Sequence, residues 1–134
     1  MPERTDQLAY PIVSYENADA AIDWLKRAFG AEEIAVHKGD DGQVEHMELS
    51  FEGGVVMGGS KRVGELAGKV EIGSPTSIYL VVSDPDAHHE RAVAAGAEVV
   101  IPLRDEDYGS RGYSALDPEG NVWSFGTYRP VLPG

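Results

Sequence analysis

The chain has 134 residues, of which 42% are hydrophobic and 25% charged, enough for one domain with a real core or two small packed modules. Its formal net charge of −12 argues against nucleic acid and against anionic membrane surfaces, which both attract basic faces. There is no cysteine, which excludes disulfides and thiolate chemistry. No apolar run approaches a membrane span, and the N-terminal residues do not resemble a signal peptide, so we expect a cytoplasmic protein.

The first half of the chain predicts a strand, a helix and three more strands. Residues 8–16 form the first expected strand, although Pro11 suits only an edge or a strand start. Asn17 is a typical N-cap, apolar residues recur at helical spacing, and Gly30 follows as the C-terminal cap, which predicts a helix over 18–29. The three further strands are expected over 31–37, 44–51 and 55–59.

The second half repeats this order after a Gly-rich stretch over 61–75, which we interpret as a linker or flap. A strong strand covers 76–82, and Asp84 and Pro85 start a helix that Gly96 ends. A strand over 98–101 and a loop over 102–110 follow. The last element is a hairpin over 112–128, whose turn contains Asp117, Pro118, Gly120 and Asn121.

The sequence Gly-Ala-Glu follows each helix, at residues 30–32 and 96–98, so the chain is an internal repeat of βαβββ units. We therefore predict an α+β fold with two tandem βαβββ modules, 1–60 and 76–134, within one structural domain. The modules would form a curved sheet with helices outside and a concave face for a ligand or a partner. A ferredoxin-like sandwich and a single α+β sheet are the alternatives.

The repeat and two motifs resemble a known family. Tyr108-Gly109-x-Arg111 leads into Asp117-Pro118-Glu119-Gly120-Asn121-x-Trp123-Ser124-Phe125-Gly126-Thr127, and Glu45-His46-Met47-Glu48-Leu49 occupies the third strand. This pattern, over residues 8–128, is similar to the vicinal oxygen chelate superfamily, and in particular to its glyoxalase/bleomycin-resistance branch with the PhnB-like members. The superfamily includes isomerases, dioxygenases and binding proteins, so the resemblance specifies the fold more closely than the function.

The resemblance also implies where a metal would be held. Catalytic members place His or Glu ligands at positions that fall at Tyr10, near Gly58, at Ser77 and at Ser124 of this chain. Neutral hydroxyls and glycine bind divalent cations poorly, so we expect no metal and no cofactor there. His46 and Glu48 share one strand face and could supply at most two ligands of an atypical site.

The concave face should carry aromatic and polar side chains suited to a flat or amphipathic organic molecule. The same residues could instead fill a small cavity or a dimer interface. The expected ligand-binding residues are Tyr10, Ile12, His46, Glu48, Ser77, Tyr79, Tyr108, Arg111 and Ser124.

Three functions remain open from the sequence. The first is a metal-free binding protein, similar to the antibiotic-sequestering members of the family, which resemblance implies to be a homodimer with its crevice between two chains. The second is a glyoxalase- or dioxygenase-type enzyme built around His46 and Glu48. The third is an interaction module without a small ligand. Trp123 and Phe125 are assigned to the core, because they lie on the face opposite to Ser124.

Overall fold

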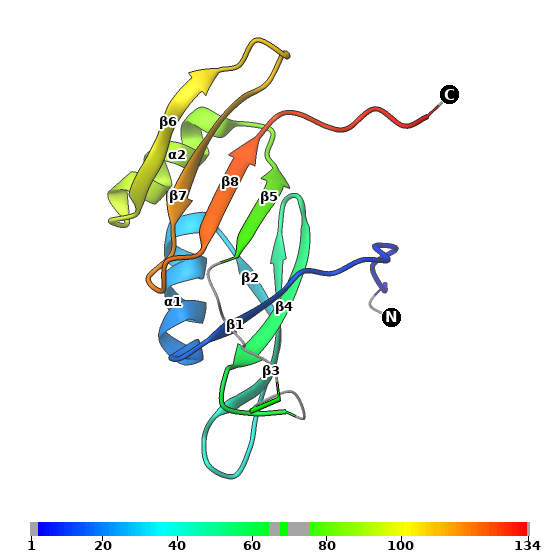
Figure 1. The fold of residues 1–134 in the computed structure, drawn as a ribbon, viewed down its shortest axis with the longest axis vertical. Coiled ribbons are helices and arrows are strands. Elements are labelled where there is room, and N and C mark those ends of the chain that lie inside the picture. Colours follow the sequence, from blue (N-terminus) through cyan, green and yellow to red (C-terminus); the bar gives the residue numbers. More distant parts are fainter. Residues whose placement is uncertain (1–2, 65–67, 70–75, 134) are drawn as a thin grey trace.

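The protein consists of two βαβββ modules in tandem (Figure 1). The computed structural model describes residues 3–64, 68–69 and 76–133, so most of the predicted linker lies outside the described residues. Each module contains a strand, a helix and three further strands, which confirms the predicted order. The elements are β1 (Ile12–Tyr15), α1 (Ala18–Phe29), β2 (Glu32–Lys38), β3 (Val44–Phe51), β4 (Gly54–Ser60), β5 (Ser77–Val81), α2 (Pro85–Ala94), β6 (Glu98–Asp105), β7 (Arg111–Leu116) and β8 (Val122–Gly126).

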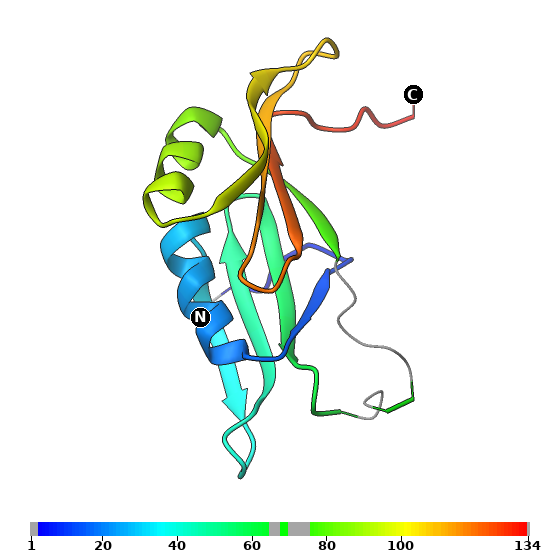
Figure 2. The same cartoon turned by 60° about the vertical axis from the view of Figure 1, so that its left-hand side comes forward.

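Each module has its own four-stranded mixed sheet, so the strands form two sheets and not one continuous sheet. The orders are β1-β4-β3-β2 and β5-β8-β7-β6, and in each the first strand runs parallel to the last. Both helices lie on the same side of the two sheets (Figure 2). This arrangement confirms the α+β class. Neither α1 nor α2 covers the opposite face of each sheet, here called the open face.

Two strands, β1 and β6, have an end that differs from the prediction by several residues. β1 begins only at Ile12, because the side chain of Gln7 bonds to both backbone groups of Val55 at 2.8 and 3.0 Å in place of a further ladder. β6 continues to Asp105, into the expected loop over 102–110, although it contains Pro102. β6 is an edge strand with a register shift at this point, so the missing N–H of Pro102 breaks no essential ladder bond.

The two modules share one core on the helix side. Phe29, at the end of α1, lies 4.8 Å between ring centroids from Phe125 of β8, and Phe51 of β3 lies 5.3 Å from Trp123. Trp123 is fully buried and Phe125 is 1% exposed, which confirms their predicted place in the core. Rings from both modules are buried in one cluster, so the hydrophobic core joins the two modules.

A buried polar cluster also joins the modules. The carboxylate of Asp117 accepts a hydrogen bond of 2.7 Å from the hydroxyl of Tyr15 and one of 3.0 Å from the indole of Trp123. It also accepts bonds from Asn121 and from the amide N–H of Glu119, so the residues of the turn place several donors around one carboxylate. Burial, together with this carboxylate, raises the pKa of Tyr15 well above its ordinary value, which keeps the phenol a neutral donor.

Across the described residues, no helix is long and apolar enough to cross a membrane.

Candidate functional site: a hollow on the open face of the second module

A hollow of about 340 Å³ lies on the open face of the second sheet. Side chains alternate along a strand, so Tyr113 of β7 points toward α2 while Ser114 points to the open face. Ser124 and Tyr79 are paired residues of β8 and β5 and point to the same side as Ser114. The hollow is lined by Tyr79, Ile101, Arg104, Glu106, Tyr108, Ser110, Gly112, Tyr113, Ser114, Ser124, Phe125 and Gly126.

The floor of the hollow is polar and its rim is aromatic. The hydroxyl groups of Ser114 and Ser124 form a hydrogen bond of 2.6 Å with each other. Tyr79 donates from its hydroxyl to the carbonyl of Tyr128 at 2.9 Å, and partial burial raises its pKa above the ordinary value. Tyr108 and Tyr128 pack edge to face at 5.5 Å, and Tyr79 and Tyr108 remain 45% and 62% exposed. Such rings can stack on a flat ligand, while the serines below can hydrogen-bond to it.

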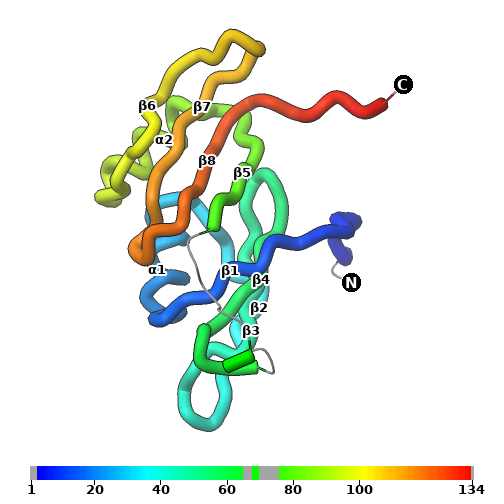
Figure 3. The backbone as a smooth tube through the Cα atoms, viewed as in Figure 1, coloured from blue at the N-terminus to red at the C-terminus, as the bar shows by residue number. Residues whose placement is uncertain are grey.

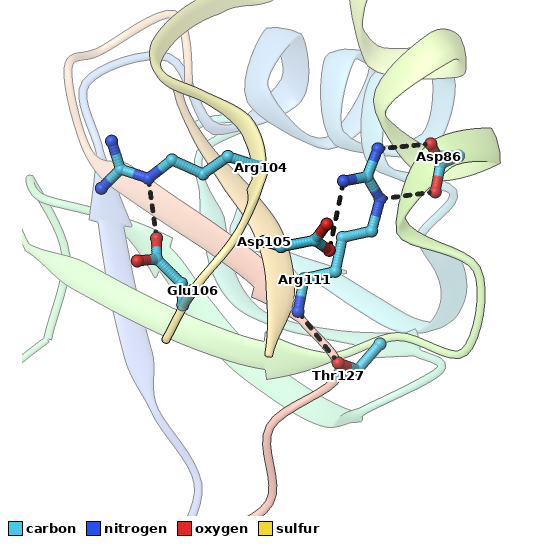
Figure 4. Close-up of polar contacts among 6 residues, drawn as sticks. All are labelled: Asp86, Arg104, Asp105, Glu106, Arg111 and Thr127. Atoms are coloured by element: carbon cyan, nitrogen blue, oxygen red, sulfur yellow. Dashed lines mark hydrogen bonds and ion pairs between the residues drawn. The ribbon is translucent and has the colours of Figure 1, made fainter. Parts of the chain in front are cut away.

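One charged pair borders the hollow and was not expected from the sequence. Arg104 donates from Nε to Glu106 at 2.8 Å, and this bond raises the pKa of Arg104 further (Figure 4). Both residues belong to the stretch that was interpreted as a loop, so no strand face could be assigned to them. Extension of β6 to Asp105 is what brings them to the hollow.

Arg111, an expected ligand-binding residue, points elsewhere. Its guanidinium donates two hydrogen bonds to Asp86 of α2, at 2.9 and 3.0 Å, and a third of 3.3 Å to Asp105 (Figure 4). These carboxylates raise the pKa of Arg111 above its already high ordinary value. The side chain joins β7 to α2, and it is not among the residues that line the hollow. The structure therefore gives Arg111 a bridging place on the helix side.

The other expected residues divide between the modules. Tyr79, Tyr108 and Ser124 come together in the hollow. Ile12 and Glu48 each pair with Met57, so the two lie in one row across the open face of the first sheet. Ser77 is exposed at the start of β5. The hydroxyl of Tyr10 donates to the carbonyl of Gln7 at 2.7 Å, and His46 lies next to Glu48 on β3.

His46 and Glu48 contact each other directly. His46 Nε2 lies 2.7 Å from Glu48 Oε2, and the ring of His37 stacks on that of His46 at 6.1 Å. This contact engages one ring nitrogen of His46 and one carboxylate oxygen of Glu48 with each other. In residues 3–64, 68–69 and 76–133 there is no group of three or more His, Asp or Glu side chains that could hold a metal ion.

Paired βαβββ modules with an open sheet face define the class of fold, and the function depends on the residues placed on that face. The family model for the Glyoxalase/Bleomycin resistance protein/Dioxygenase superfamily matches residues 7–125. The chain belongs to this superfamily. The expected PhnB-like branch finds no separate support among the comparisons.

Relatives in sequence include Mb0911c from Mycobacterium bovis and Rv0887c from Mycobacterium tuberculosis, both described as uncharacterised proteins. Each is 36% identical over 125 residues, which cover 87% of this chain and 80% and 71% of the two relatives. TioX from a Micromonospora species has a similar crystal structure, with 31% identity, a TM-score of 0.74, and coverage of 95% of this chain and 100% of TioX. A family member from Burkholderia phytofirmans, at 20% identity and a TM-score of 0.69, covers 88% of this chain and 95% of its own and supports the fold alone.

Proposed function

We propose that this protein binds a small aromatic or amphipathic molecule in the hollow of the second module without a catalytic metal, in the manner of a sequestering protein. The observation that carries the proposal is a hollow of about 340 Å³ with hydrogen-bonding serines at its floor and exposed tyrosines at its rim. That volume is at the lower end for small-molecule sites. The ion pair of Arg104 and Glu106 supplies one polar edge for orienting such a ligand.

The side chains at the positions where catalytic members of the family hold a metal support ligand binding without a metal. Ser124 shares its hydroxyl with Ser114, and Tyr10 donates its hydroxyl to a backbone carbonyl. Ser77 is a neutral hydroxyl on an exposed strand start. None of these groups provides the anionic oxygen or imidazole nitrogen that divalent cations prefer. Sequestration needs affinity alone, so this donor set is compatible with it.

We further propose that the functional unit is a homodimer in which the open faces are covered. Ile12 is 67% exposed on the first sheet, and Tyr79 and Ile101 are 45% and 40% exposed on the second. Large apolar side chains gathered on sheet faces are typical of surfaces that meet a ligand or a partner. Sedimentation equilibrium should report a dimer, and a monomer at all concentrations would contradict this part of the proposal.

The binding test is a thermal-shift and calorimetric screen with planar aromatic natural products, including bleomycin-type compounds. A ligand of the hollow should raise the melting temperature of the wild type, and Tyr79→Ala should weaken binding by roughly tenfold, because stacking on an aromatic ring contributes about 0.5–1.5 kcal/mol beyond area burial. Arg111→Ala is the matched control, since Arg111 points to α2, and it should bind as wild type. Absence of binding by every compound would contradict the proposal.

A metal-dependent glyoxalase- or dioxygenase-type reaction at His46 and Glu48 is the competing function, and metal analysis separates the two. The protein should be purified without chelator, and Ni, Zn, Mn, Co and Fe should be measured by mass spectrometry. Our proposal predicts less than stoichiometric metal that does not change in His46→Ala. Stoichiometric metal that is lost in this variant would favour the enzyme.

A further inference from the structure

The two modules hold each other through matching hairpins. The β7–β8 hairpin presents Glu119, whose carboxylate accepts the N–H groups of Glu16 and Asn17 at 2.7 and 2.9 Å where β1 leads into α1. The β3–β4 hairpin presents Glu52, which accepts the N–H of Ser83 at 3.0 Å where β5 leads into α2. Figure 3 shows both hairpins beside the strand–helix junction of the other module. Each module therefore contributes one carboxylate to the helix start of its neighbour.

The two contacts differ in what fills the space beneath them. Under the first hairpin, the ring of Tyr15 is fully buried and its hydroxyl bonds to Asp117. In the repeat, Val82 takes the place of Tyr15, two residues before the helix cap, and Phe51 takes the place of Asp117 at the close of the hairpin. Valine lacks the phenol ring. A cavity of about 300 Å³, lined by Val82 and Phe51 among others, lies at this second contact.

The cavity has apolar walls and a charged rim. Phe29, Phe51 and Phe125 provide aromatic walls from both modules. The carboxylates of Glu52 and Asp84 lie at the rim, and hydrogen bonding to Ser83 lowers the pKa of Glu52, so it is an anion at neutral pH.

Two further groups of the lining carry nitrogen. Arg91 also borders the cavity, but its guanidinium donates to the carbonyls of Arg27 and Lys26 at 3.0 and 3.1 Å and so serves the end of α1. His88 bonds through Nδ1 to the hydroxyl of Tyr113 at 2.6 Å. The rim therefore carries two carboxylates and one guanidinium, which leaves a net negative charge. Glu52 and Asp84 accept the N–H groups of Ser83 and Ala87, and a carboxylate that accepts one N–H can accept further donors from a ligand.

We propose that this cavity between the modules is a second ligand site, distinct from the hollow of the open face, and that it takes a flat one- or two-ring aromatic amine. The ring occupies the place that Tyr15 fills at the other contact, between phenylalanines that favour offset or edge-to-face packing. The ammonium group lies at the rim toward Glu52 and Asp84. The ring thus follows from the difference between the two repeats, and the charge of the ligand follows from the carboxylates at the rim.

The test uses three probes with the same ring and different charge, namely tryptamine, indole and indole-3-acetate, measured by calorimetry or by protein-observed NMR. Tryptamine should bind roughly two- to fivefold more tightly than indole, which corresponds to about 0.4–1 kcal/mol and lies within the range for an exposed ion pair. Indole-3-acetate should bind most weakly. Glu52→Gln keeps an acceptor for Ser83 and should reduce the preference for tryptamine over indole. An equal or reversed order of the probes would overturn the assignment of an amine.

Two variants test the place of the ring. Val82→Tyr supplies the missing ring from the protein and should weaken tryptamine binding by about tenfold or more, since the site is then filled. Ala87 is an exposed lining residue in the first turn of α2. Ala87→Leu narrows the opening of the cavity without altering the core, so it should also weaken tryptamine binding. Ala94→Leu, an identical change at an exposed position at the end of the same helix, is the matched control. Full binding by folded Ala87→Leu would overturn the proposal, whatever the open-face hollow binds.

Discussion

The carboxylate of Asp117 offers the sharpest test of how the two modules are held together. It lies 5% exposed at the junction and accepts five hydrogen bonds, from Tyr15, Trp123, the amide N–H of Glu119, and both the backbone and the side chain of Asn121. In Asp117→Asn one oxygen becomes an NH₂ group that faces these donors. The variant therefore loses the negative charge and leaves buried donors without an acceptor.

The expected loss of stability is about 3–5 kcal/mol, because at least two buried donors lose their acceptor at about 1–3 kcal/mol each. Domains of this kind have total unfolding free energies of about 5–15 kcal/mol, so the change is a large fraction of the whole. Tyr15→Phe should cost less, about 1–2 kcal/mol, because one of the five bonds disappears and the other donors keep their acceptor.

Urea unfolding followed by tryptophan fluorescence measures both variants. With a slope of about 1.5–2 kcal/mol per M, Asp117→Asn should lower the midpoint by roughly 1.5–3 M. Trp123 bonds to the altered side chain, so its emission should also change in the folded state. A midpoint within about 0.5 M of wild type, or a larger effect from Tyr15→Phe, would refute the view that this carboxylate holds the junction.

Two further predictions concern the other contact between the modules. A Cβ added at Gly53 would lie 2.8 Å from the backbone N and O of Val81, so Gly53→Ala must push β5 away and should cost about 1–3 kcal/mol in urea unfolding; an unchanged midpoint would contradict this close approach. Burial lowers the pKa of His88 below its ordinary value of about 6.5, so the folded chain favours the neutral ring and stability should fall as pH decreases from about 7 to 5. His88→Gln should remove that part of the pH dependence, whereas His89→Gln should keep it, and equal pH profiles for wild type and His88→Gln would contradict the assignment.

The sequence predicted the local elements well where cap residues and periodicity agree. The helix over Ala18–Phe29 is confirmed at both ends, because Asn17 accepts the N–H of Ala20 and Gly30 takes a φ of 74°. The end of β6 could not be foreseen, because Pro102 is a strand breaker unless the strand lies at an edge, and edge position is a property of the whole sheet.

The site was less accessible to sequence reasoning than the fold. Alternation along strands placed Tyr79 and Ser124 on one face, and the structure brings them together in the hollow. The same reasoning could not place Arg111. The orientation of its side chain depends on an ion pair with Asp86 of α2, which lies far from it in the sequence. Arg104 and Glu106 were missed because the extension of the strand to Asp105, which contains Arg104 and directly precedes Glu106, was not recognised. Long-range partners of charged side chains carry no periodic signal in the sequence.

The two hairpin contacts contain different buried side chains. This difference restricts which segments the two repeats could exchange in evolution. Exchange of the β7–β8 turn for the β3–β4 turn would bring Phe51 against Tyr15, whose buried hydroxyl would then lack its acceptor. The reverse exchange would bury the carboxylate of Asp117 against Val82, with no phenol to donate to it. The repeats are therefore alike in backbone but no longer interchangeable, and a recombination event that shuffles one hairpin must carry its opposing strand with it.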